Sequence, residues 1–286
     1  MANALDSSRI SPTAHYTGYV WCRNGISHPV FETRRGWFLF NALRPMNFVY
    51  RQMGGSTLEG MLLARHQVID QLLVEAIESG RVGQVIEVAA GLSPRGYRFS
   101  TRYREQGLRY IEGDLPDMVE QKRAVLAAGG LSGDNHHVVE LNALNDDGPN
   151  SLASIGAEYL DPGVGTAIIT EGLLGYFSLD DVRGMWRRFS SLLGAYPHGL
   201  YLSDLNHGGD ANNMRGTKLF RTLLSAFARG QVYTHFDGGS DEAAAELEAC
   251  GFSSAEIHNP QHFTEHLQLS HQSEPTVVRV IEARIG

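Results

Sequence analysis

An apolar strand that runs into a turn of small residues, at 84–98, constrains the fold of this chain more than any other segment. The segment reads QVIEVAAGLSPRGYR, and its opening run of β-branched residues is typical of a buried strand. Ala89 and Gly91 follow directly, and a turn without bulky side chains lets a ligand approach the backbone. In open α/β sheets, nucleotide-like ligands bind at this edge, beyond the carboxyl ends of the strands.

Strand-like and helix-like segments alternate beyond this turn. Alternation of this kind predicts a mainly parallel sheet with helices on both of its faces. The expected strands are 84–89, 109–113, 136–141, 166–171, 199–204, 252–258 and 276–284. The expected helices are 56–79, which ends at Gly80, and then 96–106, 117–128, 149–159, 179–194, 214–228 and 240–250.

Composition excludes several classes of protein. The chain has 286 residues, of which 42% are hydrophobic, enough for one large α/β domain or two small ones. Its net charge of −8 does not favour phosphate backbones or anionic membranes, so we expect neither nucleic acid nor a membrane as partner. The polar N-terminus does not resemble a signal peptide, and no apolar run approaches the ~20 residues that span a bilayer.

The number and spacing of the cysteines indicate the cellular compartment. Cys22 and Cys250 are the only two, they lie far apart, and they do not follow a metal-binding spacing. We therefore expect no disulfide framework and no metal site, and a cytoplasmic location. The sequence does not indicate an oligomeric state.

Polar residues follow the expected strands in order along one sheet edge. Asp114 ends the second strand about 20 residues after the turn, where a carboxylate accepts both ribose hydroxyls of a bound nucleoside. Asn142 follows the third strand and Glu171 ends the fourth. One polar strand end is commonly a turn or a helix cap. Several in order predict a binding site.

The turn does not fit a dinucleotide or a nucleoside triphosphate. A dinucleotide turn reads G-x-G-x-x-G, and alignment on Gly91 places Ala89 at the first glycine and Pro94 at the third. A Walker phosphate loop is absent, because no G-K-[ST] occurs. The turn therefore predicts a nucleoside that lacks a pyrophosphate.

Three motifs occur in order along the chain: VIEVAAGLSPRGYRF, YIEGDLPDMVEQKRAVL and TAIITEGLLGYFSLDDV. Together they resemble the leucine carboxyl methyltransferase family, over roughly 60–200. That family includes tetracenomycin-type O-methyltransferases of polyketide biosynthesis and the enzyme that methylates the C-terminal leucine of a protein phosphatase. The resemblance implies an α/β class I methyltransferase fold, Rossmann-like, with a seven-stranded sheet whose last strand is antiparallel. It also implies S-adenosylmethionine (SAM) as cofactor, and an N-terminal helical cap over 1–80 before a methyltransferase domain over 81–286.

The resemblance also implies a set of cofactor-binding residues. Arg65 matches the family's arginine that pairs with the methionine carboxylate, and Asp114 matches the carboxylate on the ribose. The complete expected set is Arg65, Glu87, Ala89, Gly91, Asp114, Asn142, Ala143 and Glu171. The family turn usually reads G-x-G-x-D-x-R, whereas here Ala89 replaces the first glycine and Ser93 the aspartate. Asn142 stands where an aspartate is common, and its amide can still hydrogen-bond an adenine edge.

The implied activity is transfer of a methyl group to a carboxylate or hydroxyl of a small molecule, for example a polyketide-type metabolite. A carboxylate is already ionised at neutral pH, whereas a hydroxyl needs a base, for which His207 is the candidate. The candidate acceptor contacts are Tyr16, Tyr19, Trp21 and Tyr176. Two alternatives stay open: a non-catalytic protein that binds SAM or substrate, and methylation of a protein C-terminus.

Overall fold

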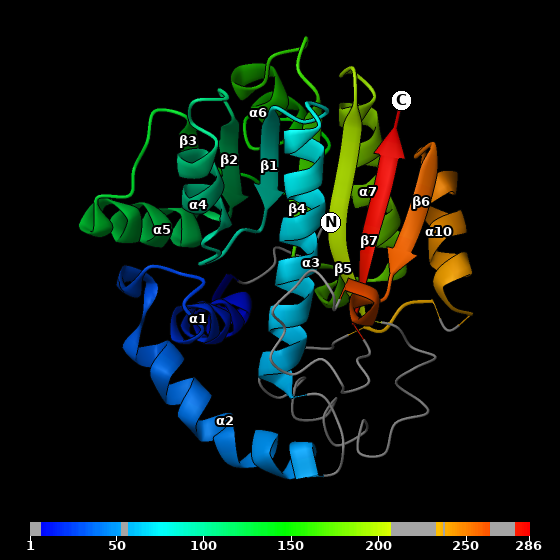
Figure 1. The fold of residues 1–286 in the computed structure, drawn as a ribbon. Coiled ribbons are helices and arrows are strands. Elements are labelled where there is room, and N and C mark those ends of the chain that lie inside the picture. Colours follow the sequence, from blue (N-terminus) through cyan, green and yellow to red (C-terminus); the bar gives the residue numbers. More distant parts are fainter. Residues whose placement is uncertain (1–6, 53–56, 207–232, 237, 264–277) are drawn as a thin grey trace.

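A mixed seven-stranded sheet forms the centre of the computed structural model, which describes residues 7–52, 57–206, 233–236, 238–263 and 278–286. The strand order is β3-β2-β1-β4-β5-β7-β6 (Figure 1). The strands are β1 (Gln84–Val88), β2 (Arg109–Asp114), β3 (His136–Glu140), β4 (Thr166–Thr170), β5 (Gly199–Asn206), β6 (Ser254–His258) and β7 (Val278–Ile285). Strands β1 to β5 pair in parallel, and β7 runs antiparallel to both neighbours. The expected sheet is thus confirmed, including its antiparallel last strand.

Helices cover both faces of this sheet. The described helices are α1 (Ser7–Arg23), α2 (Arg34–Gln52), α3 (Leu58–Glu78), α4 (Arg95–Arg102), α5 (Pro116–Gly129), α6 (Leu152–Tyr159), α7 (Leu179–Leu193) and α10 (Ser240–Ala249). Short 3-10 turns occur at η1 (Pro29–Phe31), η2 (Leu174–Tyr176) and η3 (Pro260–Phe263). The helix expected over 214–228 lies outside the described residues. None of the described helices is long and apolar enough to cross a membrane.

Successive side chains of each central strand enter different cores, as the twofold period of a strand requires. Ile86 and Val88 pack with α6, α7 and α10, whereas Val85 packs with α3 and α4 on the other face. Helix α3 therefore belongs to a layer that covers the sheet. Its C-terminus follows the expected pattern, because Gly80 has a φ of +74° two residues after the helix ends. A division of the chain into a cap over 1–80 and a domain over 81–286 stays a prediction.

The N-terminal helices α1 and α2 pack closely against each other. A Cβ at Gly36 of α2 would lie 2.3 Å from the carbonyl oxygen of His15 in α1, so a glycine is required at this crossing. Tyr16 of α1 and Phe40 of α2 share a small core with the start of α3. Figure 1 shows α1 next to the carboxyl ends of the central strands, with α2 on its far side. This arrangement places α1 over the edge where a ligand was expected.

Candidate functional site

The carboxyl ends of β1 to β4 and the inner side of α1 enclose a cavity of about 970 Å³, including its opening to solvent. Its lining residues are Thr13, Ala14, Thr17, Trp21, Arg65, Val88, Ala89, Ala90, Gly91, Leu92, Asp114, Leu115, Met118, Leu141, Asn142, Ala143, Leu144, Glu171, Gly172, Leu173, Tyr176 and Phe177. The lining contains every expected cofactor-binding residue except Glu87. It also contains Trp21 and Tyr176 of the four expected acceptor contacts.

The small-residue turn after β1 is tied to the end of β2. Asp114 accepts two backbone hydrogen bonds, one from Gly91 N (2.7 Å) and one from Leu115 N (2.8 Å). Burial raises the pKa of the Asp114 carboxyl, although these two N–H groups oppose the effect. Ser93 N donates to Ala90 O within the turn. Since the N–H groups of Gly91 and Ser93 are used internally, this turn does not offer them to a pyrophosphate.

The backbone of this turn is in the left-handed region. Gly91 has a φ of +52°, which a glycine adopts without penalty, but Ala89 has a φ of +55°. A left-handed alanine costs about 1–2 kcal/mol. Ala89, which stands where the family turn usually has its first glycine, therefore adds local strain.

A buried lysine supports the turn from the side of α5. Lys122 Nζ donates to Ser93 O (2.6 Å) and Gly91 O (3.2 Å), and lies 2.9 Å from a Glu112 carboxylate oxygen. Although burial alone would raise the pKa of the Glu112 carboxyl, Lys122 and His136 hold it below its usual value. The sequence does not indicate a role for Lys122, because nothing in its local pattern distinguishes it from a lysine on the surface of α5.

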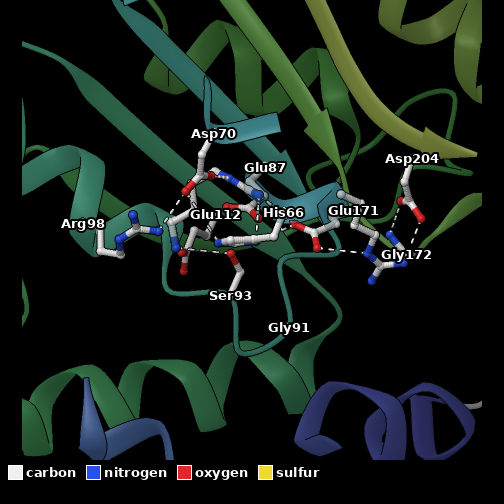
Figure 2. Close-up of polar contacts among 12 residues, drawn as sticks. His66, Asp70, Glu87, Gly91, Ser93, Arg98, Glu112, Glu171, Gly172 and Asp204 are labelled. Carbon is white, nitrogen blue, oxygen red and sulfur yellow. Dashed lines mark hydrogen bonds and ion pairs between the residues drawn. The ribbon is translucent and has the colours of Figure 1, made fainter. Parts of the chain in front are cut away.

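A fully buried arginine, Arg95, connects the helices and strands behind the turn. Figure 2 shows three carboxylates of this region, those of Asp70, Glu87 and Glu171. Arg95 donates from Nε to Asp70 of α3 (2.6 Å), from Nη1 to Glu87 of β1 (2.7 Å) and from Nη2 to Glu171 after β4 (2.7 Å). Each of its three nitrogens thus meets a different carboxylate. Arg95 was not among the expected site residues, although it occupies the arginine position of the family turn motif.

Glu87 lies behind the cavity and does not line it. Its side chain is 1% exposed, and its two oxygens accept hydrogen bonds from Arg95 and from the Tyr110 hydroxyl (2.7 Å). The direct cofactor contact expected of Glu87 is therefore not supported by the geometry. Its position in a strand buried on both faces explains the discrepancy, because such a strand shows no sequence alternation from which to infer the direction of a side chain.

Glu171 joins this buried cluster to the cavity. Its Oε1 accepts from Arg65 Nε (3.1 Å), and its Oε2 lies 2.8 Å from His66 Nδ1. Burial favours the neutral acid, but His66 and Arg95 hold the pKa of the Glu171 carboxyl well below its usual range. Arg65 Nη1 in turn donates to Asp204 (2.8 Å). Its Nη2 carries no hydrogen bond among the described residues.

The expected acceptor contacts divide into two groups. The Tyr176 hydroxyl donates to Thr13 Oγ1 (3.0 Å), which links the rim of the cavity to α1, and Trp21 packs on His66 with ring centroids 4.8 Å apart. Tyr16 and Tyr19, in contrast, pack against Phe40 of α2, with ring centroids 6.0 and 5.2 Å away. Burial raises the pKa of Tyr16 to about 12. The structure thus places these two tyrosines in the packing between helices and not at the cavity.

The candidate base, His207, lies outside the described residues. No histidine is among the described residues that line the cavity.

Comparison with known proteins identifies related sequences. The model of the family described as "Leucine carboxyl methyltransferase" matches residues 36–189, more than half of the chain. A protein of Mycolicibacterium gilvum, named as a candidate S-adenosyl-L-methionine-dependent methyltransferase, is 35% identical over 128 residues, or 45% of this chain and 39% of that protein. A protein of Streptomyces avermitilis with the same kind of name is 31% identical over 135 residues, 47% and 45% of the two chains. The matches thus reach less than half the length of these relatives.

Solved structures share the fold over nearly the whole chain. A DUF574 family protein from Streptomyces avermitilis has a TM-score of 0.62 at 14% identity, and covers 96% of this chain and 97% of its own. A candidate methyltransferase from Thermobifida fusca has a TM-score of 0.61 at 13% identity, with 99% and 97% covered. At such low identity, these neighbours show the fold alone, and it is the expected class I methyltransferase fold.

Among the described residues, Arg95 is the one partner that Asp70, Glu87 and Glu171 share, and its replacement by methionine removes it. We expect Arg95→Met to lower the free energy of unfolding by about 3–5 kcal/mol, because the buried Glu87 loses its counter-charge, while Asp70 and Glu171 each lose one of their cationic partners. Arg104→Met is the matched control, since Arg104 forms an exposed ion pair with Asp134 and should change stability by no more than about 0.5 kcal/mol. Urea denaturation of both variants is the measurement. Equal free energies of unfolding for Arg95→Met and Arg104→Met would contradict the role given to Arg95.

Acid should destabilise the protein partly through Glu171. The pKa of this carboxyl is depressed in the folded state, so its contribution is present above the unfolded value of about 4.3 and is lost as the pH falls below it. In that range, Glu171→Gln should reduce the slope of stability against pH by up to about 1.4 kcal/mol per pH unit. The pKa of the Asp114 carboxyl is raised, so its contribution to the pH dependence of stability has the opposite sign. Asp114 is present in both the parent and Glu171→Gln, so its contribution cancels when the two slopes are compared. Urea denaturation at several pH values between about 3 and 6 gives both slopes, and parallel curves would refute the assignment.

Proposed function

The chain belongs to the leucine carboxyl methyltransferase family, and from this premise we propose that it is a SAM-dependent O-methyltransferase acting on a small molecule. One observation carries the proposal: Asp114, Arg65 and Glu171 come from three distant segments and meet at the rim of one cavity beneath α1. The two free cysteines, Cys22 and Cys250, support a cytoplasmic location for this activity.

The donor set of the cavity fits SAM. Each Asp114 oxygen accepts one backbone hydrogen bond, and a carboxylate has about four acceptor sites, so capacity for two ribose hydroxyls remains. Arg65 has a guanidinium nitrogen available for the methionine carboxylate, and Asn142 and Ala143 line the part of the cavity expected to hold adenine. The internally bonded turn disfavours the alternative of a dinucleotide.

The charge of the rim also suits this cofactor. The rim carries two carboxylates, Asp114 and Glu171, and one guanidinium, Arg65. This excess of negative charge attracts a sulfonium cation. Bound SAM would supply an electrophilic methyl group. The chain's own residues bind and orient the reactants, and α1 covers the cavity and limits the access of water. Orientation of this kind can contribute ~7–11 kcal/mol to catalysis.

For the acceptor we favour a carboxylate over a hydroxyl. A carboxylate is ionised at neutral pH and needs no base, in keeping with a described lining that contains no histidine. A hydroxyl acceptor, for instance on a polyketide-type metabolite, would require a base such as His207. The alternatives are a non-catalytic protein that binds SAM, and transfer to the C-terminal carboxylate of a protein.

Loss of the Asp114 carboxylate should weaken SAM binding. We expect Asp114→Ala to reduce the affinity for SAM and for its demethylated product by more than about tenfold, because a hydrogen bond to a charged group contributes about 1.5–3 kcal/mol. Glu120→Ala, which removes an exposed acid on α5, the helix that follows β2, should bind as the parent does. Isothermal titration calorimetry with both ligands and with NAD tests this. Binding of NAD in place of SAM, or an unchanged Asp114→Ala, would refute the proposed site.

Turnover should produce a methyl ester. A screen of carboxylic acids, phenols and C-terminal peptides with isotopically labelled SAM, read by mass spectrometry, identifies the acceptor class. With a carboxylate acceptor, we expect a rate that is flat between about pH 6 and 9 and only a mild loss in His207→Ala. A rate that rises with the pKa of a histidine and falls 10²–10⁴-fold in His207→Ala would assign a hydroxyl acceptor. SAM binding without any product would favour the non-catalytic alternative.

A further inference from the structure

Helix α2 has an outward face that is rich in aromatic side chains. Trp37, Phe38 and Phe48 are 52%, 64% and 64% exposed, and they account for three of the four large hydrophobic side chains so exposed in the described part of the chain. The other side of the helix, at Gly36 and Phe40, is buried against α1. Burial within the described fold therefore does not account for the outward aromatics.

The same helix concentrates positive charge on an acidic protein. Residues 34–52 contain four arginines and no Asp or Glu, whereas the whole chain has a net charge of −8. Arg34, Arg35 and Arg44 are exposed, and none of them forms an ion pair with a described residue. Arg34 and Arg35 also occupy the first turn of α2, where the helix dipole disfavours cations. The charge of these arginines thus lacks a compensating partner within the described chain.

We propose that α2 docks on an anionic phospholipid surface. Aromatic side chains on an interfacial helix lie at the headgroup level, and neighbouring arginines pair with lipid phosphates. Trp37 and Phe48 are eleven residues apart, so the aromatic face extends about 16 Å along the helix, a ridge that matches a flat surface better than a groove. The net charge of the whole molecule argues against binding to anionic membranes. The positive charge of α2 is, however, local to this helix and opposite in sign to the net charge of the chain.

A second copy of the chain is a less suitable occupant of this face. A symmetric pair would place the same patch on both sides of the interface, and α2 against α2 would oppose arginine to arginine. The charge of α2 therefore favours an anionic partner over itself.

Co-sedimentation of the full chain with vesicles tests the proposal. We expect binding to phosphatidylcholine vesicles that contain phosphatidylglycerol, weakened by salt, and little binding to phosphatidylcholine alone. The double variant Arg34→Glu/Arg35→Glu should lose more than about tenfold in vesicle affinity, since each basic residue near an anionic surface contributes to binding. Trp37→Ser/Phe38→Ser should lose a similar amount.

Arg102→Glu/Arg104→Glu is the matched control, because it makes the same change in net charge at side chains that are 58% and 53% exposed. It should bind vesicles as the parent does, and all variants should retain SAM affinity, which also reports folding. If a double variant fails to fold, Phe38→Ser alone replaces it. Absent vesicle binding, equal binding to neutral vesicles, or an equal loss in the control would overturn the proposal. So would a homodimer, seen by sedimentation velocity, that the α2 variants abolish.

Discussion

The buried guanidinium of Arg95 is the interaction on which the arrangement behind the cavity depends. Transfer of one charged group out of water costs several kcal/mol, and attraction offsets this only where the geometry is good and the hydrogen bonds are complete. The geometry at Arg95 is good, because each of its three nitrogens donates to a different carboxylate. Asp70, Glu87 and Glu171 are in turn fixed on α3, on β1 and at the end of β4. One side chain at the start of α4 thus sets the position of three elements.

This cluster and the cavity share Glu171. One of its oxygens faces Arg65 at the rim, and the other faces Arg95 and His66 in the interior. A substitution at Glu171 therefore affects stability and the rim together, whereas Asp114 holds only two backbone N–H groups. The structure separates two kinds of carboxylate that look alike in the sequence.

The parts that the sequence predicted are those with a local cause. Strands such as β1, β4 and β7 follow from apolar runs that contain β-branched residues, and the rim residues follow from polar side chains at consecutive strand ends. Burial of Arg95 has no local cause, since two of its partners lie 25 and 76 residues away along the chain. Tyr16 and Tyr19 were expected at the acceptor because they are aromatic, yet that property suits packing between helices equally well. Helices α1 and α2 were expected only as part of an N-terminal helical cap, and their contact depends on the absence of a side chain at Gly36.

The departures of the turn from the family pattern can be understood from its supports. Ala89 holds a left-handed conformation at a cost, and such strain persists only where the surroundings determine the backbone. Two side chains do so here: Asp114 binds the N–H of Gly91, and Lys122 binds the carbonyl groups of Gly91 and Ser93. Ser93 replaces an acid without leaving a void in the network, because its Oγ accepts the N–H of Arg95 (3.3 Å). The shape of the ligand-facing turn is thus maintained by residues outside the turn motif, which is why the motif itself tolerates two replacements.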